Sequence, residues 1–571
     1  MKNFASFSSV ILISLVLIIT RIFYTDTSQP LPIKVTTWDA LGYYLYLPST
    51  HIYHDDTSFD WFKKIDSTYQ LSGGTFYQAQ PHANGKLVYK YLRGVSLLQL
   101  PFYYAAHAYA SISKQYPADG FSYPYQFAIA FGALFFVILS LFILRNILIR
   151  YYKDSTVAIT LFLLVIASNA IQYIAIEGGQ SHGYIFPLYV FILYCTIRWH
   201  ENYKLIWSFL IGLIIGIATI SRPTEAIMLL IPLLWNKNNV QLWNEKWQKI
   251  KQQKTHLIVV FIGGFLGILP QLIYWKRITG SWIYDVGSKW DFLNPHFRVL
   301  VGWEKGWFIY TPVTMLFVIG LFFLKQKPFK TAIITFCILN IYIIISWHIW
   351  RYGGSYSTRA LVQSYPVFAI PLAGIVDYIM SRKLKWVFIP LSIYLIIVNL
   401  FQLRQYNLGI LHYDDMNRKY YSSIYLNPNP SALDMSLLDT KDFISNESGY
   451  NKKTIYEQQE KITLLPNSTF FEDTIKLNQS NHQQYLKVNA RINSYEHLWN
   501  NSLMATCILD NDTLIHSFRL MHPLAKVNLM NDYAFYIQLP STSTKAILSL
   551  KINSTDYHGV MESLIVNILS R

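Results

Sequence analysis

The chain has 571 residues, of which 52% are hydrophobic and only 14% are charged. A soluble globular protein carries about 25% charged residues, so the composition excludes one large soluble enzyme. The aromatic fraction of 16% excludes a disordered chain. The three cysteines, Cys195, Cys337 and Cys507, lie far apart without CxxC spacing and indicate neither a disulfide framework nor a zinc ribbon. Composition alone therefore indicates a membrane protein.

Runs of apolar residues follow one another along the first 403 residues, and a bilayer core is crossed by roughly 20 such residues. The first run, Ala5 to Tyr24, has no small-residue cleavage site after it, so we expect a retained signal anchor. The other runs cover 123–144, 156–176, 183–199, 205–221, 257–275, 307–324, 331–349, 360–380 and 386–403, with a shorter one at 225–235. We therefore expect about eleven transmembrane helices.

Much of the net charge of +16 lies in the segments that connect these runs. The basic segments are 145–154, 198–204, 236–254, 325–330 and 381–385. The positive-inside rule places them in the cytoplasm, with the N-terminus inside and the C-terminus outside. We expect a multi-pass protein of the inner (cytoplasmic) membrane, and the charge requires no nucleic-acid partner.

The chain divides into a membrane domain at 1–410, a linker at 411–439 and a polar tail at 440–571. The membrane domain includes an outward loop, 25–122, in which Trp38–Pro48 and Gly94–Ala110 are typical of helices that lie in the membrane interface. The tail has alternating runs typical of an all-β sandwich, at Tyr485–Ile492, Leu503–Leu509, Tyr533–Leu539, Ala546–Ile552 and Val560–Leu569. The predicted fold class is an α-helical polytopic membrane protein with a C-terminal, extracytoplasmic β-sandwich-like domain.

Charged side chains gather at the outward ends of the apolar runs, where they are costly and so are functional candidates. Asp39 lies at the start of the first interfacial helix, and Tyr43 shares its helix face. A carboxylate there can accept a proton from an acceptor group or help to hold a divalent cation. The alternative is a helix cap, because Thr36 and Asp39 have capping-box spacing.

Two further clusters lie in the outward loop. His54 and Asp55, followed by Asp56, offer ligands for a metal or for sugar hydroxyls, or else form a solvated turn. Lys90 and Arg93 precede the second interfacial helix and suit a lipid phosphate, although basic side chains at interfaces also snorkel.

The turns between later spans hold more candidates. Glu177 and His182 flank two glycines and either face a cavity or form a polar turn. Arg222 lies at the outward tip of a short hairpin, where it can hold a phosphate or form a structural ion pair with Glu225.

The segment 347–359 combines two arginines, Arg351 and Arg359, with Gly353-Gly354 and several aromatic residues. Glycines let backbone N–H groups approach an anion, and arginines make bidentate contacts with phosphate. An aromatic belt explains the tryptophans but not both arginines, so the pattern favours an anion site.

Short motifs along residues 5 to 420 point to a family. They are Tyr43–Pro48, Asn84-Gly85-Lys86, Pro117–Ser122, Ser181-His182, Arg222-Pro223-Thr224, Lys305-Gly306-Trp307, Gly353-Gly354-Ser355 and His412-Tyr413-Asp414. With the acidic helix at Asp39, this pattern resembles the GT-C superfamily of integral-membrane glycosyltransferases, especially its protein O-mannosyltransferase and aminoarabinose transferase branch. It is also similar to uncharacterised Bacteroidetes-type membrane proteins of that superfamily.

The resemblance implies inverting transfer of a sugar from a polyprenyl-phosphate donor to a glycan, lipid or protein acceptor at the outer face. Asp39 would be the general base, and Arg222, Arg351, Arg359 and Lys90 would stabilise the departing phosphate. A divalent metal ion is a possible cofactor. The alternatives are a transporter or flippase of lipid-linked sugars and a non-enzymatic, glycan-binding membrane scaffold. Few polar residues inside the spans disfavour a transporter, and the outward Arg, Asp and His residues disfavour a scaffold.

Overall fold

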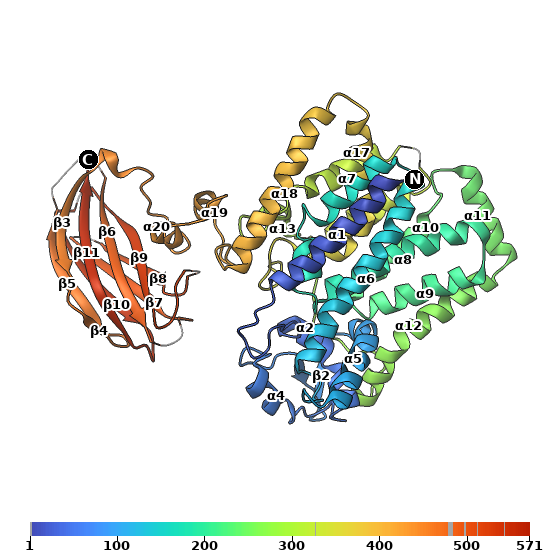
Figure 1. The fold of residues 1–571 in the computed structure, drawn as a ribbon, viewed down its shortest axis with the longest axis horizontal. Coiled ribbons are helices and arrows are strands. Elements are labelled where there is room, and N and C mark those ends of the chain that lie inside the picture. Colours follow the sequence, from blue (N-terminus) through green and yellow to red (C-terminus); the bar gives the residue numbers. More distant parts are fainter. Residues whose placement is uncertain are drawn as a thin grey trace. The chain divides into compact units, whose positions relative to one another are not determined.

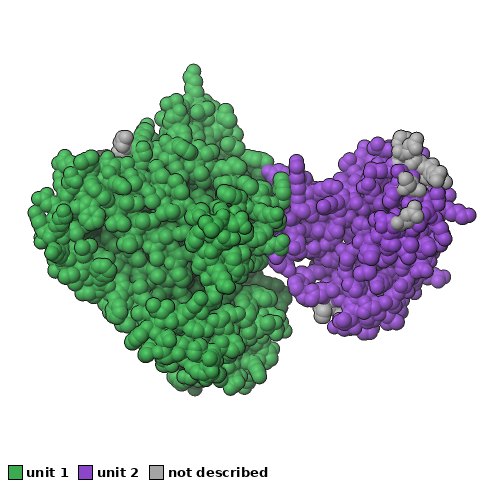
Figure 2. All heavy atoms as spheres, turned by 180° about the vertical axis from the view of Figure 1, so that it is seen from behind, with its two compact units in different colours: residues 1–403 green, residues 404–571 purple. Residues whose placement is uncertain are grey.

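The computed structural model describes residues 3–325, 327–477, 483–495, 498–510, 512–522, 524–541 and 543–571. The chain forms two compact units, residues 1–403 and 404–571, coloured separately in Figure 2. The first unit is almost entirely helical, and the second is dominated by β-strands (Figure 1).

The first part of the helical unit contains the long loop 25–122 and the helices around it. These elements are α1 Phe4–Phe23, α2 Trp38–Tyr44, α3 Tyr46–His51, α4 Phe62–Tyr69, β1 Ala79–Pro81, β2 Leu87–Tyr89, α5 Gly94–Ser113, α6 Tyr123–Ile149, α7 Asp154–Val165, the π-helix η1 Gln172–Ile176 and α8 Ser181–Asn202. The two helical segments expected within the loop are thus present, as α2 with α3 and as α5.

The second part of the helical unit runs from α9 to α18. Its elements are α9 Leu205–Thr219, η2 Pro223–Leu229, α10 Leu230–Leu234, α11 Val240–Gln252, α12 Thr255–Thr279, α13 Arg298–Val301, α14 Trp307–Tyr310, α15 Thr314–Ile319, η3 Gly320–Phe323, α16 Lys330–Ile345, η4 Arg359–Ser364, α17 Tyr365–Met380 and α18 Lys385–Asn407.

Within the described residues, five helices are long and apolar enough to cross a membrane. They are Phe4–Phe23, Tyr123–Ile149, Thr255–Thr279, Arg359–Met380 and Lys385–Asn407, and several shorter apolar helices accompany them. The helices indicate a multi-pass membrane protein and confirm the predicted helical class. The count of about eleven spans stays a prediction.

Several expected spans are interrupted. The run 156–176 forms α7, then leaves the helix after Val165 and resumes as η1. The freed carbonyls of Ile166 and Ser168 accept hydrogen bonds from Nδ2 of Asn399, at 2.8 and 2.9 Å. Backbone groups inside a membrane protein need such partners, so the amide from α18 stabilises the break.

Helices α9 and α12 are in backbone contact. A Cβ added to Gly212 would lie 2.0 Å from the Val260 carbonyl oxygen, and one on Gly263 would lie 2.3 Å from that of Phe209. Small residues allow such close approach between membrane helices. The hydropathy of the two segments gives no sign of this pairing.

The C-terminal unit contains two antiparallel sheets. Their strands are β3 Asn451–Gln458, β4 Ile462–Leu464, β5 Thr469–Lys476, β6 Gln484–Ser494, β7 Ser502–Leu509, β8 Thr513–Arg519, β9 Met530–Leu539, β10 Lys545–Asn553 and β11 Gly559–Ser570. One sheet has the order β5-β10-β7-β8, and the other has β3-β11-β6-β9 with β4 paired to β11. All five strands expected from the sequence are present.

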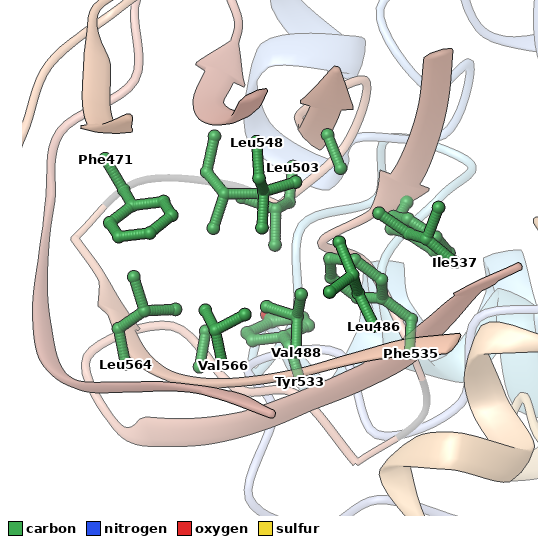
Figure 3. Close-up of a cluster of buried hydrophobic side chains, with 14 of the residues drawn as sticks. Phe471, Leu486, Val488, Leu503, Tyr533, Phe535, Ile537, Leu548, Leu564 and Val566 are labelled. Atoms are coloured by element: carbon green, nitrogen blue, oxygen red, sulfur yellow. The ribbon is translucent and has the colours of Figure 1, made fainter. Parts of the chain in front are cut away.

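A hydrophobic core fills the space between the two sheets (Figure 3). Phe471, Leu503 and Leu548 come from the first sheet, and Val488 and Val566 face them from the second. Strand β10 alternates strictly between buried and partly exposed residues, as expected for a sheet with one buried face. The β-rich C-terminal region of the predicted fold class is therefore confirmed.

The segment expected to be a linker contains two short helices, α19 Arg418–Ile424 and α20 Ala432–Ser436. It is tied to the sandwich by Arg519 of β8, whose Nη2 lies 2.7 Å from Oδ1 of Asp439. Nη1 of the same arginine lies 3.0 Å from Nε2 of His412. Residues before the first strand therefore belong to the C-terminal unit.

Candidate functional site

Asp39 lies in the first turn of α2 and has three partners from distant parts of the chain. Its Oδ1 accepts hydrogen bonds from the hydroxyls of Tyr77, at 3.0 Å, and Tyr91, at 2.5 Å. Its Oδ2 lies 2.5 Å from Nη2 of Arg359 in an ion pair. The side chain of Asp39 is 27% exposed and that of Arg359 is 11% exposed, so both charges are largely removed from solvent.

The alternative role of Asp39 as a helix cap is not observed. Helix α2 has Thr37 at its N-cap, with no hydrogen bond from a capping side chain. The hydroxyl of Thr36 instead accepts a hydrogen bond from Nε2 of Gln126, at 2.7 Å. The carboxylate of Asp39 is therefore directed at the tyrosines and the arginine.

A small hairpin places the two tyrosines side by side. Strands β1 and β2 pair Ala79 with Tyr89, and the backbone N–H of Lys90 continues the ladder by donating to the carbonyl of Gln78. Extending this antiparallel register places Tyr77 opposite Tyr91, where directly paired side chains share a face. Both phenols can therefore reach the same carboxylate oxygen.

The environment keeps Asp39 ionised. Burial alone raises the pKa of its carboxyl, but the charge of Arg359 and the hydrogen bonds from Tyr91, Arg359 and Tyr77 outweigh burial and hold the pKa below its ordinary value. A carboxylate of lowered pKa is a weak base. While this ion pair is intact, Asp39 is held in place but is poorly reactive toward a proton.

The turn between η1 and α8 packs against the segment before α2. A Cβ on Gly179 would lie 2.1 Å from the carbonyl oxygen of Val35, so this close approach requires glycine. Glu177 accepts a hydrogen bond from Nε2 of Gln172 at 2.9 Å, and burial raises the pKa of its carboxyl, against the opposing charge of Arg359. The turn thus adds a second carboxyl to the surroundings of Arg359.

His182 and Glu225 belong to a buried hydrogen-bonded chain. Nδ1 of His182 lies 2.8 Å from Oε1 of Gln363, whose Nε2 donates to Oε1 of Glu225 at 3.0 Å. The hydroxyl of Tyr189 donates to the other carboxylate oxygen of Glu225. Both oxygens of Glu225 are thereby used by neutral groups.

The charge of Arg222 acts on the carboxyl of Glu225. Nη1 of Arg222 is buried and has no hydrogen-bond partner among the residues that the structure describes. The charge of Arg222 acts on Tyr43 and on His182, as does that of Arg359, so both arginines contribute to one positive region. Burial raises the pKa of Tyr43, which keeps its hydroxyl protonated.

Lys305 organises the segment that leads to Arg359. Its buried Nζ donates to the carbonyl of Arg351, at 2.9 Å, and to that of Gly353. Gly353 has a φ of +66°, and a Cβ there would lie 3.4 Å from Nη2 of Arg359. The guanidinium of Arg351 itself lies 5.4 Å from the ring centre of Trp350.

His54 and Asp55 form a local turn. Oδ1 of Asp55 accepts hydrogen bonds from the backbone N–H groups of Thr57 and Ser58, and Oδ2 accepts one from Phe59. Burial raises the pKa of Asp55, but these hydrogen bonds prevail and lower it to about 2. The hydrogen bonds of Asp55 are thus those of a local turn, which was the alternative to a ligand site. The neighbouring Asp56 forms an ion pair with Arg277.

Lys90 and Arg93 both lie over aromatic rings. Nζ of Lys90 is 5.9 Å from the ring centre of Tyr77, which brings it beside the Asp39 cluster. The guanidinium of Arg93 lies 5.5 Å from the ring centre of Tyr46. Of the two, Lys90 is thus linked to the candidate site through one of its tyrosines.

The described part of the chain contains no group of three or more His, Cys, Asp or Glu residues that could hold a metal ion. Tyr77 was not singled out from the sequence, Tyr91 was noted only as a neighbour of Lys90, and Lys305 was named within a family motif. The only signal for the tyrosines is their position on either side of a short hairpin.

Residues 123–275, which run from the start of α6 into α12, match the model of the dolichyl-phosphate-mannose-protein mannosyltransferase family. Over this stretch, which lies among the apolar helices, the chain is therefore similar to a family of glycosyltransferases. No curated protein matches the sequence.

Three solved structures show a weak similarity to the chain. ArnT from Cupriavidus metallidurans is 11% identical, with a TM-score of 0.40, over 74% of this chain and 69% of its own. The arabinosyltransferase EmbB from Mycobacterium smegmatis is 10% identical, with a TM-score of 0.31, over 97% of this chain and 64% of its own. The VP2 subviral particle of infectious bursal disease virus is 14% identical, with a TM-score of 0.17, over 24% of this chain and 36% of its own.

Proposed function

We propose that this protein transfers a sugar from a polyprenyl-phosphate donor to a glycan, lipid or protein acceptor at the outer face of the inner membrane. The observation that carries the proposal is the cluster of Asp39, Arg359 and Arg222. It combines one ionised carboxylate with two arginines, one of which has a buried, unpartnered N–H group. A phosphate satisfies such a group through a charge-assisted hydrogen bond.

The transfer would invert the configuration at the anomeric carbon. The acceptor oxygen forms a bond to that carbon as the bond from the carbon to the phosphate oxygen breaks, and the lipid phosphate leaves with the electron pair. Asp39 receives the acceptor proton or orients the acceptor group. Arg222 and Arg359 stabilise the developing phosphate charge, and one such donor contributes on the order of 100-fold to the rate.

A transfer assay with membranes tests the proposal. Membranes containing wild type or Asp39→Ala receive polyprenyl phosphate carrying a labelled sugar, with host glycans, lipids and proteins as acceptors. Label should reach an acceptor only with wild type. A panel of sugars is needed because the cluster itself does not select one.

Tyr53→Phe is a matched control in the same loop. The Tyr53 hydroxyl donates to the carbonyl of Asp119, at 2.9 Å, and this variant should transfer normally. Transfer by Asp39→Ala at the wild-type rate would contradict the role of the carboxylate. Labelled lipid that crosses the bilayer without any transfer would instead favour a flippase.

A further inference from the structure

The proposed reaction needs Arg359 to bind the donor phosphate and Asp39 to act on the acceptor, but in the structure these two residues are paired with each other. Arg359 has to face the donor phosphate, yet its Nη2 lies 2.5 Å from the carboxylate that has to act on the acceptor. Phosphate and carboxylate oxygens both accept charge-assisted hydrogen bonds from a guanidinium, so a phosphate bound at Nη2 competes with Asp39 for that nitrogen. A phosphate that takes Nη2 of Arg359 displaces the carboxylate from it.

Asp39 has other partners that keep it in place when Arg359 leaves. The hydroxyls of Tyr77 and Tyr91 both reach Oδ1, whereas Arg359 contacts Oδ2. Losing Arg359 therefore frees one oxygen while the other stays hydrogen-bonded. The oxygen set free is the one next to the guanidinium, and thus next to the place where phosphate would bind.

Arg359 is also surrounded by groups that hold it in the site. Thr358, the residue before it, donates through Oγ1 to the carbonyl of Val299, at 2.7 Å. Lys305 holds the neighbouring segment through Gly353. The backbone that carries the guanidinium is thereby fixed, so a change of partner requires only side-chain movement.

We infer that Arg359 exchanges partners during the reaction: it pairs with Asp39 in the free protein and with the lipid phosphate once the donor binds. Donor binding thereby releases Oδ2 of Asp39, so the base forms only when a donor is present. Tyr77 and Tyr91 are positioning residues that hold the released carboxylate. The inference rests on the proposed function and adds an order of events, with donor before acceptor chemistry.

If Asp39 and phosphate compete for Arg359, removing the charge of Asp39 should strengthen phosphate binding, whereas removing an ordinary binding residue weakens it. Asp39→Asn removes the competing charge, so the variant should bind polyprenyl monophosphate about tenfold more tightly than wild type while losing transfer. This increase in affinity should vanish when Arg359→Gln is added, because the guanidinium for which Asp39 and phosphate compete is then absent. Wild type, Asp39→Asn, Arg359→Gln and the double variant form a double-mutant cycle.

The experiment measures binding of polyprenyl monophosphate to the full chain in nanodiscs of neutral lipid, with thermal unfolding recorded for every variant. Asp39→Ser, which is also uncharged, should give the same gain and replaces asparagine if that variant does not fold. Unchanged or weaker binding by folded Asp39→Asn and Asp39→Ser, with wild type binding normally, overturns the exchange but leaves the proposed function intact. Absence of binding by wild type and all variants overturns both.

Discussion

The ring of Tyr91 lies directly against the backbone of Gly42. A Cβ added to Gly42 would be 2.0 Å from Cδ2 of Tyr91 and 2.7 Å from its Cγ, closer than atoms can approach. The glycine lies on the same short helix as Asp39, so the missing side chain lets the phenol cross α2 and reach the carboxylate. Position 42 therefore determines the geometry of the candidate site.

Gly42→Ala should displace the ring of Tyr91 and reduce transfer, with a loss of about 1–3 kcal/mol of stability from overpacking. Thermal unfolding and the transfer assay measure the two effects. The same substitution should have little further effect in a Tyr91→Ala background. An equal penalty in both backgrounds would show that the methyl group acts on something other than Tyr91.

Arg222→Ala should weaken binding of polyprenyl monophosphate while leaving the unfolding temperature close to that of wild type. The reason is that Nη1 of Arg222 has no partner to lose among the described residues. Glu225→Ala is the informative comparison, because it leaves Tyr189 and Gln363 with unpaired polar groups and should destabilise the protein by about 1–3 kcal/mol. A large loss of stability in Arg222→Ala would contradict this assignment.

Gly212→Ala should lower the unfolding temperature far more than Gly264→Ala. The first substitution brings a methyl group 2.0 Å from a carbonyl oxygen of α12, and the second brings one only to within 3.6 Å of a carbonyl oxygen of α9. The expected cost of the first is about 1–3 kcal/mol, measured by thermal unfolding in detergent. Similar unfolding temperatures for the two variants would be evidence against backbone contact between the helices.

Lys305→Met should impair transfer by loosening the segment before Arg359. The ammonium group that binds the carbonyls of Arg351 and Gly353 would be lost, at a cost of about 1.5–3 kcal/mol for each hydrogen bond from a charged donor. Proteolysis within 351–358 should become faster in the variant. Wild-type proteolysis and transfer would show that the lysine does not hold this segment.

The C-terminal unit should become less stable as the pH falls from about 6.5 toward 4. Burial lowers the pKa of His522 to about 4, whereas an unfolded histidine titrates at about 6.5. Between these values the unfolded chain binds a proton that the folded chain does not, so acid favours unfolding. Hydrogen exchange of β8 and β9 in the full chain, corrected for intrinsic rates, measures the effect.

His522→Gln should flatten that pH dependence, since glutamine carries no titratable group. His558→Gln is a control, because it removes a histidine from another part of the same unit. A pH dependence unchanged by His522→Gln would mean that other groups cause the acid sensitivity.

Hydropathy and alternation predicted most of the architecture, but not where regular structure is interrupted. Five strands with strong alternation were identified, whereas β3, β4, β5 and β8 were not. Strands β3 and β8 are largely exposed and so lack a buried face to show in the pattern. In the membrane part, the run 307–324 is divided between α14 and α15 by Pro312, which disfavours helix at the residue before it. The break after Val165 depends on Asn399, more than 200 residues away along the chain, and no local pattern could show it.

In the candidate site, too, local sequence patterns identified some residues, and others depend on contacts between distant parts of the chain. Asp39 and Arg359 stood out because a charge at a membrane interface is costly wherever it lies. Tyr77 and Tyr91 did not, because the chain has 43 tyrosines and only the hairpin register selects these two. Asp55 drew attention as an acidic cluster, yet its oxygens are used by its own turn.

The amide of Asn399 does more than complete the backbone of the broken span. Its Oδ1 accepts a hydrogen bond from the hydroxyl of Tyr356, at 3.1 Å, and Tyr356 lies in the segment that leads to Arg359. Helix α18, which carries Asn399, continues past the boundary at Leu403 into the first residues of the C-terminal unit. One continuous helix therefore both leads the chain into the C-terminal unit and supports the segment before Arg359, so a kink in α18 near Asn399 would loosen that segment.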